Sequence, residues 1–273
     1  MEGDNLLFDI RNKDKAAKTL ERLTGVNETY WSFERMKNSG RYDYTNADED
    51  IERIISKYGG HFPNIVDIEL VVTHLTTSNN HCKEILDKGI IDLRKAYANK
   101  RSELRYFLEQ HGIEIFVDDC CLKYDGLNYD ISYGKCPRDS ESIEYAAWSV
   151  GRRIYYDFTV CGFLSMNSKR PYGGMVHRRP EILSDIDGLL CTNLQAEWFQ
   201  THKSYEVIFK IPVLETVYDG WDTDDEDEMV MKYLLDAYMC ISTEPDTKEI
   251  ICKNGIEILP AQIIECNRFR MWK

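Results

Sequence analysis

The sequence predicts an α+β protein whose strands pair mainly in the antiparallel sense. Runs of β-branched and aromatic residues, which are typical of strands, recur along the chain and are joined by turns and by segments with helical apolar spacing. Of the 273 residues, 43% are hydrophobic and 12% are aromatic, so the chain can bury a substantial core and is too rich in core-forming residues to be disordered.

The first segment, residues 1–62, is expected to be a helical N-terminal extension that precedes a domain over residues 63–273. Apolar residues recur at helical spacing in Ala16–Leu23 and again in Ile51–Ile55. The glycines and the proline of Gly59–Pro63 would interrupt any helix. The boundary between the two segments is therefore placed there.

The domain is expected to open with a strand followed by two helices. Ile65–Val72 is a β-branched run that predicts a strand ending at residues 73–76. A short helix within 78–90 follows, with a polar residue to cap its start and Gly89 to close it. A second helix is expected over Leu93–Gln110.

The middle of the chain is expected to contain a hairpin, a helix and two strands. Cys121–Tyr124 and Leu127–Ile131 flank an Asp-Gly turn, which is a strong hairpin signal. A helix over Glu141–Arg153 precedes a strand over Phe158–Ser165, and a short strand is expected over Tyr172–His177.

The last third is expected to alternate helices and strands. Pro180–Leu183 opens a helix with proline in its preferred first turn, and Tyr205–Val213 reads as a strand. A helix begins near Asp227 after an acidic first turn. An Asn-Gly turn between Glu249–Cys252 and Ile256–Pro260 predicts a hairpin.

The net charge, the hydropathy and the cysteine spacing argue against several classes of protein. With 34 Lys and Arg against 47 Asp and Glu, the net charge of −13 argues against a protein that coats nucleic acid broadly. No stretch approaches the roughly 20 apolar residues of a membrane helix, so we expect a cytoplasmic protein without a membrane segment. The nine cysteines form no CxxC pair, which favours reduced thiols and no metal site.

Three polar residues stand where strands are expected to end or turn. His74 and Thr76 follow an apolar strand and point the same way on an extended chain, so both can enter a cleft. Glu257 follows a tight turn and lies between apolar residues, where a carboxylate can stabilise a cationic transition state. The plainer interpretations, a strand-end histidine and an exposed strand glutamate, remain open at this point.

The segment Arg152–Arg179 has the most unusual local chemistry. It carries six basic residues against one acid, Asp157, and is therefore net +5 within an acidic protein. Aromatic residues and the flexible Tyr172-Gly-Gly turn lie among these charges, a combination that suits a ligand with phosphates and planar rings. A solvated basic face that balances the acidic remainder explains the same composition.

Three separated pieces of the chain together resemble the ADP-ribosyltransferase superfamily. A strand ending in His74-x-Thr76 precedes a helix and a glycine, as in the opening of that fold. The pair Cys161–Ser165 and Tyr172–Val176 is similar to its second element, and Gly255–Pro260 to its last motif. The closest likeness is to bacterial toxin and phage-defence members, some of which modify nucleic acids.

The resemblance implies a fold, a substrate and a set of site residues. The fold would be two packed, mainly antiparallel sheets with flanking helices, and residues 63–273 would be the catalytic domain. NAD would be the substrate, no metal would be needed, and ADP-ribose would pass to a protein, DNA or RNA acceptor, with an antitoxin as a further partner. Glu257 would be the catalytic residue. The NAD-binding residues would be His74, Thr76, Ser165, Tyr172 and Arg178.

Two other functions are consistent with the sequence. A defence nuclease could use His74 or His177 as a general base and the basic segment to hold phosphates. A non-enzymatic immunity or adaptor protein could use its acidic, tyrosine-rich surface as a partner interface.

Overall fold

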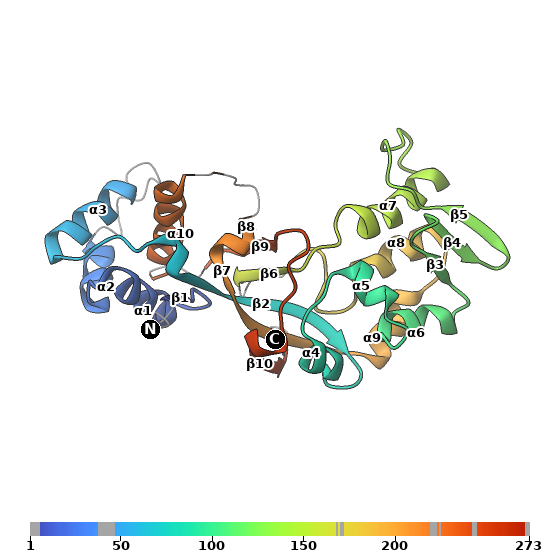
Figure 1. The fold of residues 1–273 in the computed structure, drawn as a ribbon, viewed down its shortest axis with the longest axis horizontal. Coiled ribbons are helices and arrows are strands. Elements are labelled where there is room, and N and C mark those ends of the chain that lie inside the picture. Colours follow the sequence, from blue (N-terminus) through green and yellow to red (C-terminus); the bar gives the residue numbers. More distant parts are fainter. Residues whose placement is uncertain are drawn as a thin grey trace.

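The chain is built on one large, mainly antiparallel sheet in the computed structural model (Figure 1). The structure describes residues 6–37, 47–167, 169, 172–218, 223, 225–241 and 245–270. The strand order is β10-β7-β2-β6-β9-β8, and β1 pairs in parallel with the start of β2. The strands are β1 Leu6–Phe8, β2 Ile68–Ser78, β6 Cys161–Ser165, β7 Lys203–Pro212, β8 Thr216–Tyr218, β9 Lys248–Cys252 and β10 Ile263–Arg268.

Beyond its start, where β1 pairs, the long central strand β2 has β7 on one side and β6 on the other. It pairs with β7 along Glu69 to Ser78, which makes this part of the sheet continuous. On its other side it pairs with β6 only through Thr73 and Phe163. Beyond that pair the second half of β2 and the chain leading into β6 are no longer joined as a ladder, and this break in the sheet positions the site.

Four helices gather at one end of the molecule (Figure 1). They are α1 Lys13–Thr24, α2 Glu28–Lys37, α3 Ala47–Tyr58 and α10 Glu226–Cys240. The Asn12 side chain caps the start of α1, and Gly25 ends it at a φ of 73°, which favours glycine. Leu20 and Ile54 from this end share one buried cluster with Val72 of β2, so the N-terminal helices and the large sheet have a common core.

The opposite end holds the other helices and a small antiparallel sheet of order β3-β4-β5. The helices are α5 Leu93–Ala98, α6 Glu103–Gln110, α7 Ile143–Tyr155, α8 Glu181–Leu190 and α9 Leu194–Thr201, with α4 Lys83–Lys88 below the large sheet. The small strands are β3 Glu114–Phe116, β4 Cys121–Tyr124 and β5 Leu127–Asp130. Leu122, Val150 and Ile186 belong to a second buried cluster at this end.

The α+β class and the antiparallel pairing are confirmed, but the two sheets are not packed on each other. The buried side chains of the small sheet, Ile115 and Leu122, lie in one cluster with α7 and α8. The large sheet instead buries Val72 and Phe209 in the first cluster. Helices cover each sheet because each presents one apolar face that a helix can fill.

The hairpin Cys121–Ile131 and the helices near Glu141, Pro180 and Asp227 form close to the predicted positions. The predicted helix Leu93–Gln110 is two helices, because Asn99 ends the first and Ser102 caps the second. The first strand was expected to end at residues 73–76, but β2 continues to Ser78 by pairing with β7.

Two predicted strands are wrong. Residues 172–177 form turns, because Met175 adopts a φ of 58° and its amide donates to Tyr172. The hairpin expected around the Asn-Gly turn does not form either. Strand β9 pairs with β6 and β8, while Ile258 exchanges backbone hydrogen bonds of 2.9 Å with Ile90.

Candidate functional site

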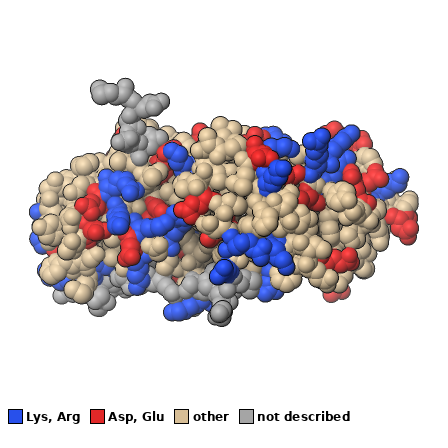
Figure 2. Space-filling model, turned by 90° about the horizontal axis from the view of Figure 1, so that it is seen from below, with Lys and Arg blue, Asp and Glu red and all other residues tan. Residues whose placement is uncertain are grey.

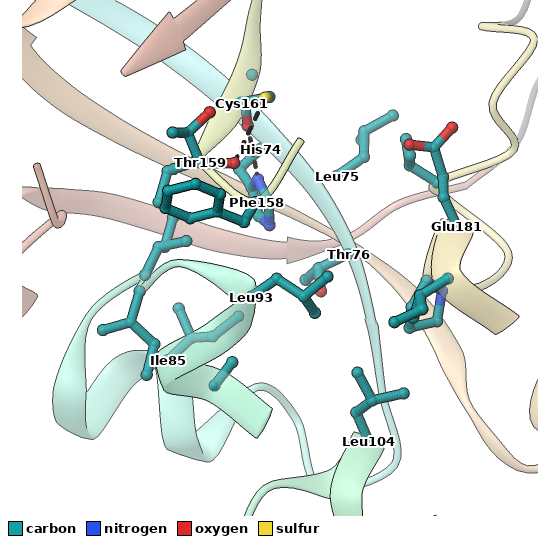
Figure 3. Close-up of a pocket in the computed structure, with 18 of the residues that line it drawn as sticks. His74, Leu75, Thr76, Ile85, Leu93, Leu104, Phe158, Thr159, Cys161 and Glu181 are labelled. Atoms are coloured by element: carbon teal, nitrogen blue, oxygen red, sulfur yellow. Dashed lines mark hydrogen bonds between the residues drawn. The ribbon is translucent and has the colours of Figure 1, made fainter. Parts of the chain in front are cut away.

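A cavity of about 510 Å³ lies where β6 leaves β2, between the large sheet and the second core. Its volume is within the range of small-molecule sites. Figure 3 shows apolar side chains of α4, α5 and α6 on one side and polar residues of β2 and α8 on the others. The polar residues that line the cavity include His74, Thr76, Arg153, Asp157, Tyr172, Arg179, Glu181 and Glu249.

The imidazole of His74 is held in one tautomer. Its Nδ1 lies 2.8 Å from the carbonyl oxygen of Cys161, and because a carbonyl only accepts, Nδ1 carries the proton and Nε2 is left as an acceptor (Figure 3). Burial lowers the pKa of His74, which favours the neutral ring at pH 7. Thr76 lies two residues further along β2 and also lines the cavity.

Tyr172 forms an aromatic wall with carboxylates around it. Its ring meets that of Phe163 edge-on, with centroids 5.2 Å apart. Burial raises the pKa of Tyr172 to about 12, and the charges of Glu249 and Glu181 add to the rise. Glu249 reaches this wall from β9, where it pairs with Phe163. An aromatic face beside carboxylates favours a planar cation.

Arg153 and Arg179 both bring positive charge to the cavity, and both are held by other groups. Arg153 binds Asp157 and also Glu181, with 3.0 Å between Nη1 and Oε2. Arg179 donates from Nε to Gln195 at 2.6 Å and from Nη1 to the Gly174 carbonyl at 2.9 Å.

The residues expected in the site fall into two groups. His74, Thr76 and Tyr172 line the one cavity, although they come from separate parts of the chain. The other three do not line it. The Ser165 hydroxyl donates to the Asp246 carbonyl at 2.6 Å, the Arg178 guanidinium lies over Phe199, and Glu257 forms an ion pair of 2.6 Å with Lys95.

Two of the carboxylates that line the cavity, Glu249 and Glu181, were not singled out from the sequence. Glu249 is the lone acid at the start of an apolar strand that the sequence did predict, so its alternation with the apolar Ile250 was an available signal. Glu181 follows Pro180 at the start of α8, where an acidic residue also serves the helix dipole. For both glutamates, the neighbouring sequence does not reveal which face of the strand or helix lines a cavity.

The basic segment does not form a continuous positive surface in the described part of the chain. Arg153 is neutralised by acidic neighbours, and Arg178 and Arg179 face different partners. Arg170 lies outside the described residues. Figure 2 shows Lys and Arg interspersed with Asp and Glu on the face seen there.

No family model, curated protein or solved structure matches this chain. Within the described ranges, no group of three or more His, Cys, Asp or Glu side chains is arranged to hold a metal ion. In the same ranges no helix has both the length and the apolar character needed to span a bilayer.

Proposed function

We propose that the protein is an ADP-ribosyltransferase that transfers ADP-ribose from NAD to a macromolecular acceptor, a nucleic acid or a protein. One observation carries the proposal: His74, Thr76 and Tyr172, three of the residues that the resemblance to that superfamily implies, line a single cavity that a glutamate of β9 also lines. Such an enzyme fits a bacterial toxin or anti-phage effector of the cytoplasm, restrained by an antitoxin.

The Tyr172 wall supports binding of oxidised nicotinamide. This ring is planar and positively charged, so it gains from stacking on a tyrosine and from the nearby charges of Glu249 and Glu181. Once the ring leaves as neutral nicotinamide, the electrostatic part of this attraction is lost, which also assists release of the product.

The ribose and the phosphates have matching groups on the other walls. The free Nε2 of His74 accepts a hydrogen bond from a ribose hydroxyl, and the Thr76 hydroxyl can donate or accept beside it. Arg179 lines the cavity and provides the charge that a pyrophosphate requires.

Glu249 takes the catalytic role in this proposal. Breaking the bond between nicotinamide and ribose sends the electron pair to the ring nitrogen and leaves oxocarbenium character on the ribose. A fixed carboxylate next to the leaving ring stabilises that charge, and the acceptor then forms the new bond to the same carbon. Glu257, for which the resemblance implies this role, is paired with Lys95 and does not line the cavity.

The test compares two glutamate variants in one assay. Protein is incubated with NAD labelled in the adenylate half and with RNA, DNA or protein acceptors, and intact mass reports the attached ADP-ribose. Glu249→Gln should lower transfer by about 10²–10³-fold, the usual effect of losing one transition-state contact. The matched control Glu257→Gln should retain activity within a few-fold, with circular dichroism confirming that both variants fold.

Four results would contradict the proposal. Wild-type protein that neither attaches ADP-ribose nor releases nicotinamide would exclude NAD chemistry. Equal activity in Glu249→Gln and wild type would remove Glu249 from the mechanism. Cleavage of labelled RNA or DNA without NAD, lost in His74→Ala, would favour a nuclease, and a cellular phenotype unaffected by His74→Ala and Glu249→Ala would favour a non-enzymatic adaptor.

A further inference from the structure

Glu181 is another carboxylate that lines the cavity. It is the first residue of α8, directly after Pro180, whose φ of −58° suits a helix start. Figure 3 shows its carboxylate across the cavity from Phe158 and Thr159, which places it on the α8 wall. Glu181 therefore lines the cavity from helix α8, whereas Glu249 lines it from strand β9.

One oxygen of Glu181 is anchored, and the other lies beside Gly174, which the Tyr172 ring also approaches. Oε2 accepts from Nη1 of Arg153 at 3.0 Å. A Cβ atom placed on Gly174 would lie 2.3 Å from Oε1 of Glu181 and 2.5 Å from Cε1 of Tyr172. The glycine therefore makes room for Oε1 and the Tyr172 ring to approach the same point.

Arg153 positions Glu181 but does not fully neutralise it. The same guanidinium binds Asp157 through Nη1 and Asp185 through Nε, the latter at 2.9 Å, so three carboxylates share one positive charge. A carboxylate that is held in place, partly buried and only partly compensated keeps its affinity for a proton.

We infer that Glu181 is the general base that removes the proton from the acceptor as ADP-ribose is transferred. The inference rests on the proposed function and adds a second catalytic residue to it. The bond between nicotinamide and ribose breaks with its electron pair on nicotinamide, and a lone pair of the acceptor forms the new bond to the ribose. The acceptor's proton passes to Oε1 of Glu181 and then to water when the product leaves. Glu249 stabilises the charge on the ribose, and Glu181 activates the incoming group.

The surroundings of Glu181 set the expected pH dependence. Burial raises its pKa, although Arg153 and Arg179 act in the opposite sense. A base works only when it is deprotonated, so transfer should rise with pH through this raised pKa and fall on the acidic side. The charged or titratable groups that face Glu181 are Arg153, Asp157, Cys161, Tyr172, Arg179, Asp185 and Glu249.

The experiment measures transfer against pH for wild type, Glu181→Gln and Asp185→Asn. Asp185→Asn is the matched control, because it removes another carboxylate from Arg153 but does not line the cavity. Glu181→Gln should lower transfer by about 10²–10⁴-fold and abolish the acidic limb of the profile. Asp185→Asn should stay within a few-fold of wild type and keep that limb, and Glu181→Asp should recover part of the lost rate.

The outcomes separate this inference from the proposed function. If wild type converts NAD and Glu181→Gln keeps its rate and pH profile, the inference is overturned while the proposed function stands. An equal loss in Asp185→Asn would reduce Glu181 to a structural contact and would also overturn it. If wild type leaves NAD unchanged, both fail together.

Discussion

Replacing Gly151 by alanine tests how α7 is seated in the second core. Gly151 is a buried residue of α7, and a Cβ atom added there would lie 1.9 Å from the carbonyl oxygen of Ile131. Real Cβ contacts essentially never fall below 3.0 Å, so the helix and the backbone at Ile131 would have to separate by more than 1 Å. Neither atom belongs to a flexible side chain, so the strain cannot be relieved by a rotamer change.

The expected magnitude follows from two opposing effects. Overpacking that requires a backbone shift costs about 3 kcal/mol at the upper end of its usual range. Alanine is better than glycine within a helix by about 1 kcal/mol. The net loss of unfolding free energy for Gly151→Ala should therefore be about 2 kcal/mol.

Gly188 in α8 provides the control, because a Cβ atom there would meet nothing within 4 Å. Gly188→Ala should benefit from the higher helix propensity of alanine without any steric cost. Its unfolding free energy should therefore rise by about 0.5–1 kcal/mol. Urea unfolding followed by circular dichroism measures both variants, and at an m-value of about 3 kcal/mol/M the midpoint of Gly151→Ala should fall by roughly 0.7 M. A Gly151→Ala protein as stable as wild type, or a destabilised Gly188→Ala protein, would refute the packing argument.

Two further predictions concern the N-terminal helices and the cavity. Hydrogen bonding from Lys57 lowers the pKa of the buried Glu34 from 4.5 to about 2, so the stability that Glu34 contributes is present above pH 4.5 and is lost as the pH falls toward 2. Urea titrations at several pH values should show the difference in unfolding free energy between wild type and Glu34→Gln shrinking over that interval, and a difference independent of pH would contradict the pairing. Gly174→Ala should displace Tyr172 and Glu181, and a shift of about 1 Å in such groups lowers transfer by at least about tenfold. Thermal unfolding should change little in this variant, and unaltered transfer would show that the crowding at Gly174 does not control the site.

The sequence predicted elements well where the signal is local. The start of α8 after Pro180 and the Asp-Gly hairpin after Tyr124 follow from turn and cap chemistry that involves only a few neighbouring residues. The same local logic failed at the Asn-Gly turn near Gly255. There the two flanking segments found better partners elsewhere, β9 between β6 and β8, and Ile258 against Ile90.

The candidate site shows the same division. His74 and Thr76 were identifiable because polar residues interrupt an apolar strand, and they do line the cavity. Glu257 was selected for its place after a turn, and Glu249 was passed over. Which of these two glutamates lines the cavity depends on which strand lies next to β6, and that pairing joins residues far apart in the chain.

The sequence by itself determined the α+β class, most helices, the central strand and the polar residues on it, because apolar period, caps and turn residues act over short distances. Only the tertiary structure decided that β6 separates from β2 after a single pair and opens a cavity there. It also decided that Glu181 and Glu249 share that cavity with Tyr172 while Glu257 turns to Lys95. These contacts arise from the pairing of strands that are far apart in the chain and from the packing of helix α8. No short stretch of sequence predicts either of them.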